Sequence, residues 1–252
     1  SNVDGEVSVK QGNEVISKNE SITAGERLSI ETELETNAAT NFSLTFLPDD
    51  TQFLTDYERQ VQNFTVMNRT FRDGGNIHVS PDGKSDGDGT VEKPLDLDTA
   101  VEYVQPGQKI ILADGNYVRD SKLEISKYND GTESQMKYLL ASDGARPVLD
   151  FDKKSEGVVL SGNYWHVKGI DVARSAGNTK GFVVGGSHNV VEASRFYENG
   201  DTGLQISRTD SEAAKEEWPS DNLILNSESF DNRDPSDNNA DGFAAKLTSG
   251  ED

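Results

Sequence analysis

The chain has 252 residues, of which 45 are acidic and 24 are basic, giving a formal net charge of −21. Such a protein repels nucleic acid and anionic membrane surfaces, so neither is expected as a partner. Cysteine is absent, which excludes disulfides and thiolate chemistry. No run approaches the ~20 apolar residues of a membrane span. The charge is compatible with cation binding or with a solvated surface outside the cell.

Residues 1–72 alternate apolar and polar side chains, a pattern typical of short β-strands with one buried face. The alternating runs are residues 6–10, 27–31, 42–46 and 63–66. Glycine-containing turns separate some of them. We predict a small β-sandwich, an Ig-like accessory module, because strands of this length with one buried face pair into two packed sheets. Nothing in this module has catalytic spacing.

The next segment predicts one short helix. Four apolar residues fall on a single helical face: Leu97, Ala100, Val101 and Val104. Asp96 or Asp98 can cap its start, and the Pro–Gly pair at 106–107 ends it. Apolar runs at 109–113 and 115–117 then begin a series of short strands. The helix is expected to cover the open end of the stack that these strands form.

A repeat of short strands dominates the second half of the chain. Four apolar strands, each opened by glycine, lie at residues 157–160, 181–184, 203–206 and 242–245. Their starts are 24, 22 and 39 residues apart, and the longest interval contains a polar insertion at 209–220. A second apolar set lies between them at 165–167, 189–191 and 222–225. Coils of about 22 residues must stack on their neighbours to bury an apolar face, so we predict an all-β parallel β-helix.

Three longer motifs narrow this fold: residues 164–170, 199–206 and 239–246, which read YWHVKGI, NGDTGLQI and NADGFAAK. With these motifs, the segment from about residue 76 to residue 252 resembles the family-nine polysaccharide lyases, whose studied members are mostly pectate lyases. The resemblance does not include residues 1–72. It implies a right-handed parallel β-helix, calcium-dependent β-elimination on a uronate-containing chain, and a secreted or cell-surface bacterial protein.

Polar corners rich in acidic residues come into register when the repeats are aligned on their opening glycines. Asp201 and Asp241 each precede a strand on the same edge of the predicted stack, where adjacent coils lie about 4.8 Å apart. Oxygen ligands without Cys or His favour Ca²⁺. The resemblance places a calcium site on Asp201, Asp237 and Asp241, with Asn238 where a further Asp is expected. The alternative is that Asp and Asn occupy these turns because they tolerate tight backbone geometry.

β-Elimination needs a base that removes the C5 proton of the sugar, and the resemblance implies a lysine. In the family this lysine follows the strand at 242–245 by a further coil, so we expect the base to lie beyond Asp252, with C-terminal coils missing from this segment. Lys246 is the nearest lysine within the chain. Arg208 is a candidate for binding the substrate carboxylate, and Trp218 is a candidate stacking face for a sugar ring.

Two other functions are consistent with the same fold. A non-catalytic extracellular adhesin or carbohydrate-binding protein keeps the β-helix without chemistry, since fold alone does not imply function. A β-helix hydrolase needs two carboxyl groups opposed across a groove, whereas the acids here share one corner. The favoured expectation is a monomeric, calcium-dependent lyase acting on an acidic polysaccharide, with this segment nearly inactive alone.

Overall fold

The computed structural model describes residues 3–49, 60–71, 74–236 and 240–248. The chain divides into two compact units, residues 1–70 and 71–252. Among the described residues, no helix is long and apolar enough to cross a membrane.

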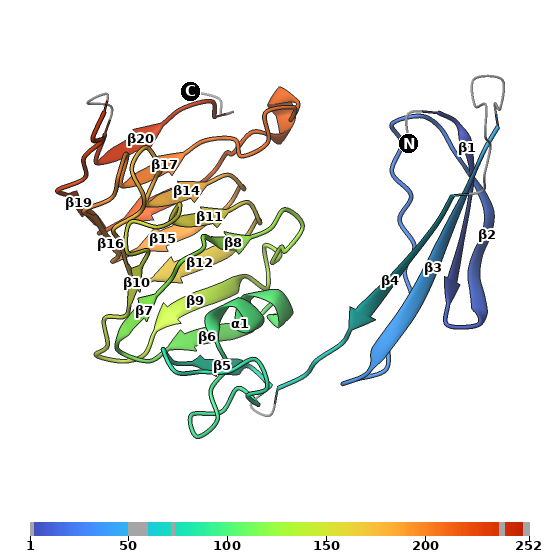
Figure 1. Ribbon diagram of the computed structural model, residues 1–252, viewed down its shortest axis with the longest axis horizontal. Coiled ribbons are helices and arrows are strands. Elements are labelled where there is room, and N and C mark those ends of the chain that lie inside the picture. The colour runs from blue at the N-terminus through green and yellow to red at the C-terminus, as the bar shows by residue number, and fades with distance from the viewer. Residues whose placement is uncertain (1–2, 50–59, 72–73, 237–239, 249–252) are drawn as a thin grey trace. The chain divides into compact units, whose positions relative to one another are not determined.

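The first unit is one antiparallel sheet in the order β2-β1-β3-β4 (Figure 1). Its strands are β1 (Gly5–Gln11), β2 (Glu14–Ile22), β3 (Ala39–Pro48) and β4 (Gln60–Met67). Val7, Val9 and Phe42 form its small core. The predicted small β module is present, but the described residues form one antiparallel sheet rather than the two packed sheets of a sandwich. The predicted strand at 27–31 is wrong, because that segment does not join the sheet. Its apolar residues still pack against the core.

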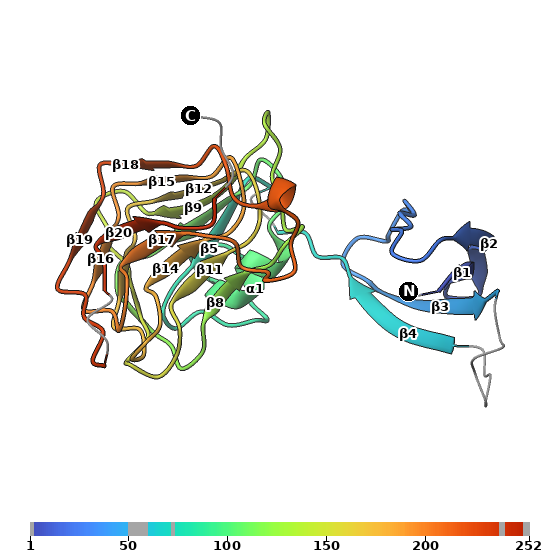
Figure 2. The same cartoon turned by 90° about the horizontal axis from the view of Figure 1, so that it is seen from above.

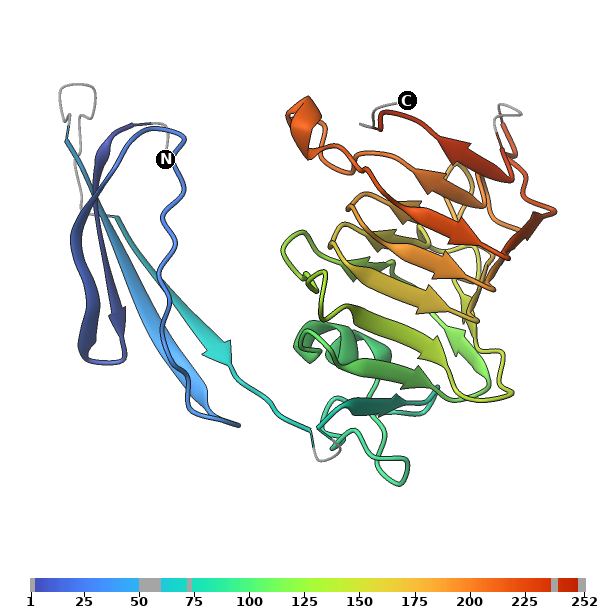
Figure 3. The same ribbon diagram turned by 180° about the vertical axis from the view of Figure 1, so that it is seen from behind.

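The second unit is a parallel β-helix, whose three sheets form three sides around a continuous apolar core (Figure 2). The first sheet holds β5 (Asn76–Val79), β6 (Lys109–Leu112), β9 (Lys137–Ala141), β12 (Trp165–Lys168), β15 (Val190–Glu192) and β18 (Leu223–Leu225). The second holds β7 (Asn116–Val118), β10 (Val148–Asp150), β13 (Asp171–Ala173), β16 (Arg195–Tyr197) and β19 (Glu228–Phe230). The stack begins at β5, one strand earlier than predicted (Figure 3).

The third sheet contains the glycine-opened strands. It consists of β8 (Leu123–Ile125), β11 (Val158–Leu160), β14 (Phe182–Val184), β17 (Leu204–Ile206) and β20 (Phe243–Ala245). Phe182 pairs with Leu204, and Leu204 pairs with Phe243, so the register predicted across the insertion is confirmed. A Cβ at Gly157 would lie 1.8 Å from the carbonyl oxygen of Gly181, which explains why the repeat needs glycine at this point of close backbone approach.

The predicted helix is α1 (Leu97–Tyr103). The Asp96 carboxylate caps it by accepting a hydrogen bond from the Thr99 amide at 2.8 Å. Its apolar face is buried against the core, in contact with β5 and β8. The helix therefore covers the edge of β8, the first strand of the third sheet, as expected from the need to protect a free strand edge.

The turns of the β-helix are built from residues with positive φ in equivalent places of successive coils. Arg174, Glu198 and Asp231 follow β13, β16 and β19 with φ of 58°, 54° and 54°. Asn199 follows Glu198, and Asn232 follows Asp231. These two asparagines are hydrogen-bonded between adjacent coils, since the Asn199 side-chain amide donates to Asn232 Oδ1 at 2.9 Å. These hydrogen bonds satisfy buried polar groups and fix the turn that carries Asp201.

Candidate functional site

Asp201 and Asp241 lie on the same edge of adjacent coils, two residues before Gly203 and one residue before Gly242, the glycines that open β17 and β20. The Gly203 amide donates to the Asp241 carbonyl oxygen at 2.9 Å, and the Asp241 amide donates to Thr202 Oγ1 at 3.4 Å. Backbone pairing between the coils thus holds the two residues on one edge of the stack. We call this pair of residues, with its surrounding turn, the acidic corner.

Asp201 is a buried carboxylate, with only 3% of the residue exposed. Its Oδ2 lies 2.7 Å from Lys180 Nζ, and its Oδ1 accepts a hydrogen bond from the Thr202 amide at 2.6 Å. Burial raises the pKa of Asp201, but the hydrogen bonds from Lys180 and Thr202 and the charge of Lys180 outweigh it, so this pKa lies below its ordinary value. Asp201 is therefore ionised at neutral pH, with both of its oxygens engaged by Lys180 and Thr202.

Asp241 is more accessible, with half of its side chain exposed. Its Oδ2 lies 3.4 Å from Lys246 Nζ, and Lys246 is itself largely exposed. The Lys246 amide donates to the Ile206 carbonyl oxygen at 2.9 Å, which places this residue at the far end of β20. The structure therefore brings the candidate base Lys246 next to Asp241, where it forms an exposed ion pair of low strength.

The remaining two predicted calcium ligands, Asp237 and Asn238, lie outside the described residues. Within the described ranges no group of three His, Cys, Asp or Glu residues is arranged to hold a metal ion. The donors at the acidic corner fit calcium in kind, because both are carboxylates and Ca²⁺ binds oxygen ligands. The described part of the corner provides two such carboxylates, those of Asp201 and Asp241. Their negative charges are balanced by the ammonium groups of Lys180 and Lys246.

Arg208 and Trp218 lie together at the opposite end of β17. The Arg208 guanidinium carbon is 5.1 Å from the centre of the Trp218 ring, a cation–π arrangement. Arg208 Nη1 donates to the Ser211 carbonyl oxygen at 2.8 Å, and Trp218 Nε1 donates to the Ala213 carbonyl oxygen at 3.1 Å. The two predicted substrate-binding residues thus organise the insertion at 209–220, which contains the 3-10 helix η1 (Lys215–Glu217).

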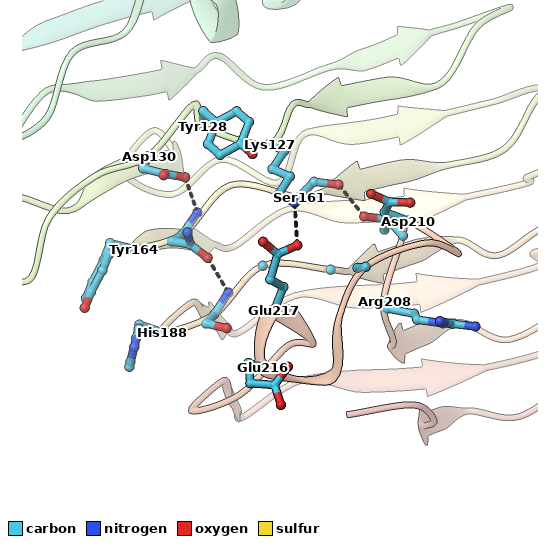
Figure 4. A pocket seen from close by; sticks show the side chains of 16 residues that line it. Lys127, Tyr128, Asp130, Ser161, Tyr164, His188, Arg208, Asp210, Glu216 and Glu217 are labelled. Carbon is cyan, nitrogen blue, oxygen red and sulfur yellow. Dashed lines mark hydrogen bonds and ion pairs between the residues drawn. The ribbon is translucent and has the colours of Figure 1, made fainter. Parts of the chain in front are cut away.

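A cavity of about 390 Å³ opens beside this insertion. We call it the insertion pocket; the lining residues that matter here are Lys127, Tyr128, Tyr164, His188, Arg208 and Glu217 (Figure 4). Lys127 Nζ lies 3.0 Å from Glu217 Oε2 and ties the insertion to the segment between β8 and β9. The pocket follows the C-terminal ends of β11, β14 and β17, whereas Asp201 precedes β17.

Lys180 is a site residue that the sequence analysis missed. It immediately precedes Gly181, and Asp201 lies two residues before Gly203, the equivalent glycine of the next coil. The aligned repeats therefore contained a signal, because residues next to equivalent glycines of adjacent coils come close together.

Residues 77–252 match the family described as "Pel9A-like, right handed beta helix region", and residues 1–66 match "Pectate disaccharide-lyase central Ig-like domain". The chain belongs to the Pel9A-like family. The family match also gives the β-helix its right-handed sense.

Several relatives are similar over much of this chain. A pectate lyase L from Thermoclostridium stercorarium is 60% identical over 99% of this chain and 20% of its own length. A pectate disaccharide-lyase from Dickeya chrysanthemi is 34% identical over 99% of this chain and 31% of its own length. The crystal structure of pectate lyase Pel9A matches 69% of this chain and 44% of that chain, with 28% identity and a TM-score of 0.58. The chain thus spans less than half the length of each of these relatives.

Proposed function

We propose that the chain is part of a calcium-dependent polysaccharide lyase that cleaves uronate-containing chains, pectate or a related polymer, by β-elimination. The observation that carries this proposal is the placement of Asp201 and Asp241 before paired strands of adjacent coils. Similarity to proteins named pectate lyase supports the same reaction class. The proposal places the protein outside the cell, because a polysaccharide of this kind is an extracellular polymer.

Calcium would be held by Asp201 and Asp241, with Asp237 and Asn238 as the further ligands expected from the sequence. When bound, it supplies positive charge that links the protein carboxylates to a sugar carboxylate and stabilises negative charge developing at the adjacent carbon. Asp201 contributes by staying ionised, as its lowered pKa indicates. Lys180 keeps this buried carboxylate compensated when no other cation is near.

Removal of the C5 proton requires a neutral amine if lysine is the base. Lys246 is the candidate among the described residues at the acidic corner, because its Nζ lies 3.4 Å from Asp241 Oδ2. Arg208 and Trp218 are proposed to bind the polysaccharide at the other end of β17. The proposed substrate-binding groups therefore lie at both ends of β17, whereas the proposed proton transfer takes place at the acidic corner alone.

Binding without cleavage is the second candidate function. One observation favours it: both lysines that lie near the acidic corner, Lys180 and Lys246, are paired with its carboxylates. A lysine held as a charged partner does not accept a proton. In that case the acidic corner would bind the acidic polysaccharide through a bridging cation without cleaving its glycosidic bonds.

An assay for the unsaturated product, which absorbs in the ultraviolet, distinguishes the two functions. Polygalacturonate is incubated at alkaline pH, with calcium or with a chelator, with this chain and with the full-length protein of which it is proposed to be part. The proposal expects the chain alone to be nearly inactive and the full-length protein to release product only with calcium, about tenfold or more slowly in Asp241→Asn, since one carboxylate ligand is lost. Retention of both on immobilised polygalacturonate without any product would instead establish binding without cleavage.

A further inference from the structure

The insertion pocket has a rigid wall made from turns of successive coils. The Asn163 amide donates to Asp130 Oδ1 at 2.8 Å, and the Ser187 amide donates to Asn163 Oδ1 at 2.7 Å. On the opposite side, Ser161 Oγ and Thr209 Oγ1 lie 2.8 Å apart and fasten the start of the insertion. The pocket is therefore preformed, and its volume of about 390 Å³ lies within the range of small-molecule sites.

Aromatic rings line this pocket. Tyr164 and His188 come from equivalent positive-φ turn positions of adjacent coils and stack with ring centres 4.7 Å apart. Figure 4 shows these two rings side by side on one wall, with Tyr128 at another side of the pocket next to Lys127. Tyr128 is 60% exposed, and Lys127 Nζ lies 5.5 Å from the centre of its ring. Exposed tyrosine rings present a flat apolar face and a hydroxyl group to a ligand.

The lining charges are predominantly negative. Four carboxylates line the pocket, those of Asp130, Asp210, Glu216 and Glu217, against two basic side chains, Lys127 and Arg208. Glu217 already compensates Lys127, and the Arg208 guanidinium stacks on Trp218. A uronate carboxylate placed here would be repelled by each lining carboxylate that no cation compensates.

Sugar hydroxyl groups have the opposite requirement, because they donate hydrogen bonds and carboxylates only accept them. Such charge-assisted hydrogen bonds are stronger than those between neutral groups. The carboxylates are not arranged as a metal cluster within the described part of the chain. Aromatic faces together with acceptor side chains and the hydroxyls of Ser161 and Thr209 are the groups that a neutral sugar ring can use.

We propose that the insertion pocket binds neutral sugar units of the polysaccharide, at the end of β17 opposite the acidic corner. Uronate units bind at the corner, and neutral units, such as those of a branch, bind at the pocket with a ring against Tyr128. Arg208 donates to hydroxyl groups in this arrangement. This inference goes beyond the proposed cleavage, since neutral-sugar binding requires neither calcium nor a base.

Calorimetric titration in the presence of a chelator tests the pocket without involving the corner metal. The probes are neutral tetrasaccharides of galactose, arabinose and glucose, with tetragalacturonate as the acidic probe. We expect at least one neutral probe to bind with a Kd in the millimolar range or below, and about tenfold more tightly than tetragalacturonate. Tyr128→Ala should raise the Kd for the neutral probe by about fivefold or more, because the aromatic surface that stacks on the sugar is lost.

A matched control is Tyr138→Ala. Tyr138 is a partly exposed tyrosine on β9 that does not line the pocket, and its ring centre lies 5.9 Å from that of His166 and 5.9 Å from Lys109 Nζ. Replacing Tyr138 should leave the affinity for the neutral tetrasaccharide unchanged. Glu216→Gln should strengthen tetragalacturonate binding by about threefold, because one repelling charge is removed.

Three outcomes would overturn the proposal: no neutral probe binds, tetragalacturonate binds as tightly as any neutral probe, or Tyr128→Ala and Tyr138→Ala have equal effects. Failure of the proposed cleavage is recognised separately, because it is measured by unsaturated product with calcium. Neutral-probe binding that depends on Tyr128, together with a full-length protein that releases no product, would overturn the lyase proposal alone.

Discussion

Asp201 and Lys180 form an ion pair between adjacent coils of the β-helix, with 2.7 Å between Oδ2 and Nζ. Lys180 precedes β14, Asp201 precedes β17, and the carboxylate is almost completely buried. A buried carboxylate requires a compensating charge. If calcium binds the acidic corner, it and Lys180 compete for the same carboxylate oxygens, so the ion pair links the stability of the turn to cation binding.

Replacing Lys180 by methionine should expose this competition. We expect Lys180→Met to lower the free energy of unfolding by about 2 kcal/mol in a chelator, because Asp201 loses its partner. Calcium should restore most of this loss by binding the native state only. Thermal unfolding with calcium and with chelator measures both effects. Lys154→Met removes an exposed partner of Asp152 and is the matched control; an equal calcium response in the two variants would contradict the competition.

Asp241→Asn and Asp231→Asn should differ in their effect on calcium affinity. Asp241 lies at the acidic corner and is fixed there by its backbone hydrogen bonds to the preceding coil. Asp231 follows β19 at φ 54°, a conformation that Asn also tolerates. Calorimetric titration with calcium should show a loss of about tenfold or more for Asp241→Asn and little change for Asp231→Asn. Similar losses would mean that the ligands come from a different part of the loop.

Lys137 should make stability increase at alkaline pH. This residue is 6% exposed, donates to Asn129 Oδ1 at 2.6 Å, and lies 5.8 Å from the Trp165 ring centre. Burial lowers the pKa of Lys137 to about 8. The unfolded chain, with a lysine pKa of about 10.4, binds more protons between these values, so the unfolding free energy gains up to about 3 kcal/mol as pH rises through this window.

Denaturant unfolding of Lys137→Met at pH values below and above this window measures the contribution by difference from the unmodified chain. In Lys137→Met the free energy of unfolding should no longer rise with pH across this window. In Lys122→Met, which replaces an exposed lysine, the rise should be retained. If the increase survives in Lys137→Met, another group must titrate on folding and the assignment to Lys137 is wrong.

Asn199→Ala should destabilise the β-helix. Asn199 is 1% exposed, accepts from the Ser175 amide at 3.1 Å and donates to Asn232 Oδ1 at 2.9 Å. Removing the side chain leaves buried polar groups unsatisfied, at a cost of about 3 kcal/mol in the free energy of unfolding. Denaturant unfolding measures this loss. The matched control is Asn76→Ala on the exposed start of β5, which should change stability by less than about 0.5 kcal/mol.

Most of the β-helix was predictable from local pattern. The glycines at 157, 181 and 203 set the register because a side chain there would collide with the next coil. Asp96 and the apolar face of α1 specified the helix, since capping and periodicity act within a few residues. The extended segment at 27–31 was predicted incorrectly as a strand, because alternation shows that one face is buried but does not show whether a neighbouring strand supplies hydrogen bonds.

The sequence by itself determined that Asp201 and Asp241 lie on one edge of adjacent coils, because the opening glycines align the repeat across the insertion and neighbouring coils lie one strand spacing apart. Asp201 and Asp241 could therefore be identified without coordinates. Only the tertiary structure decided the charge state of that corner and the shape of the insertion pocket. Lys180, Lys127 and Glu217 act through contacts between segments up to 90 residues apart, and electrostatic interactions depend on distance and burial rather than on separation along the chain.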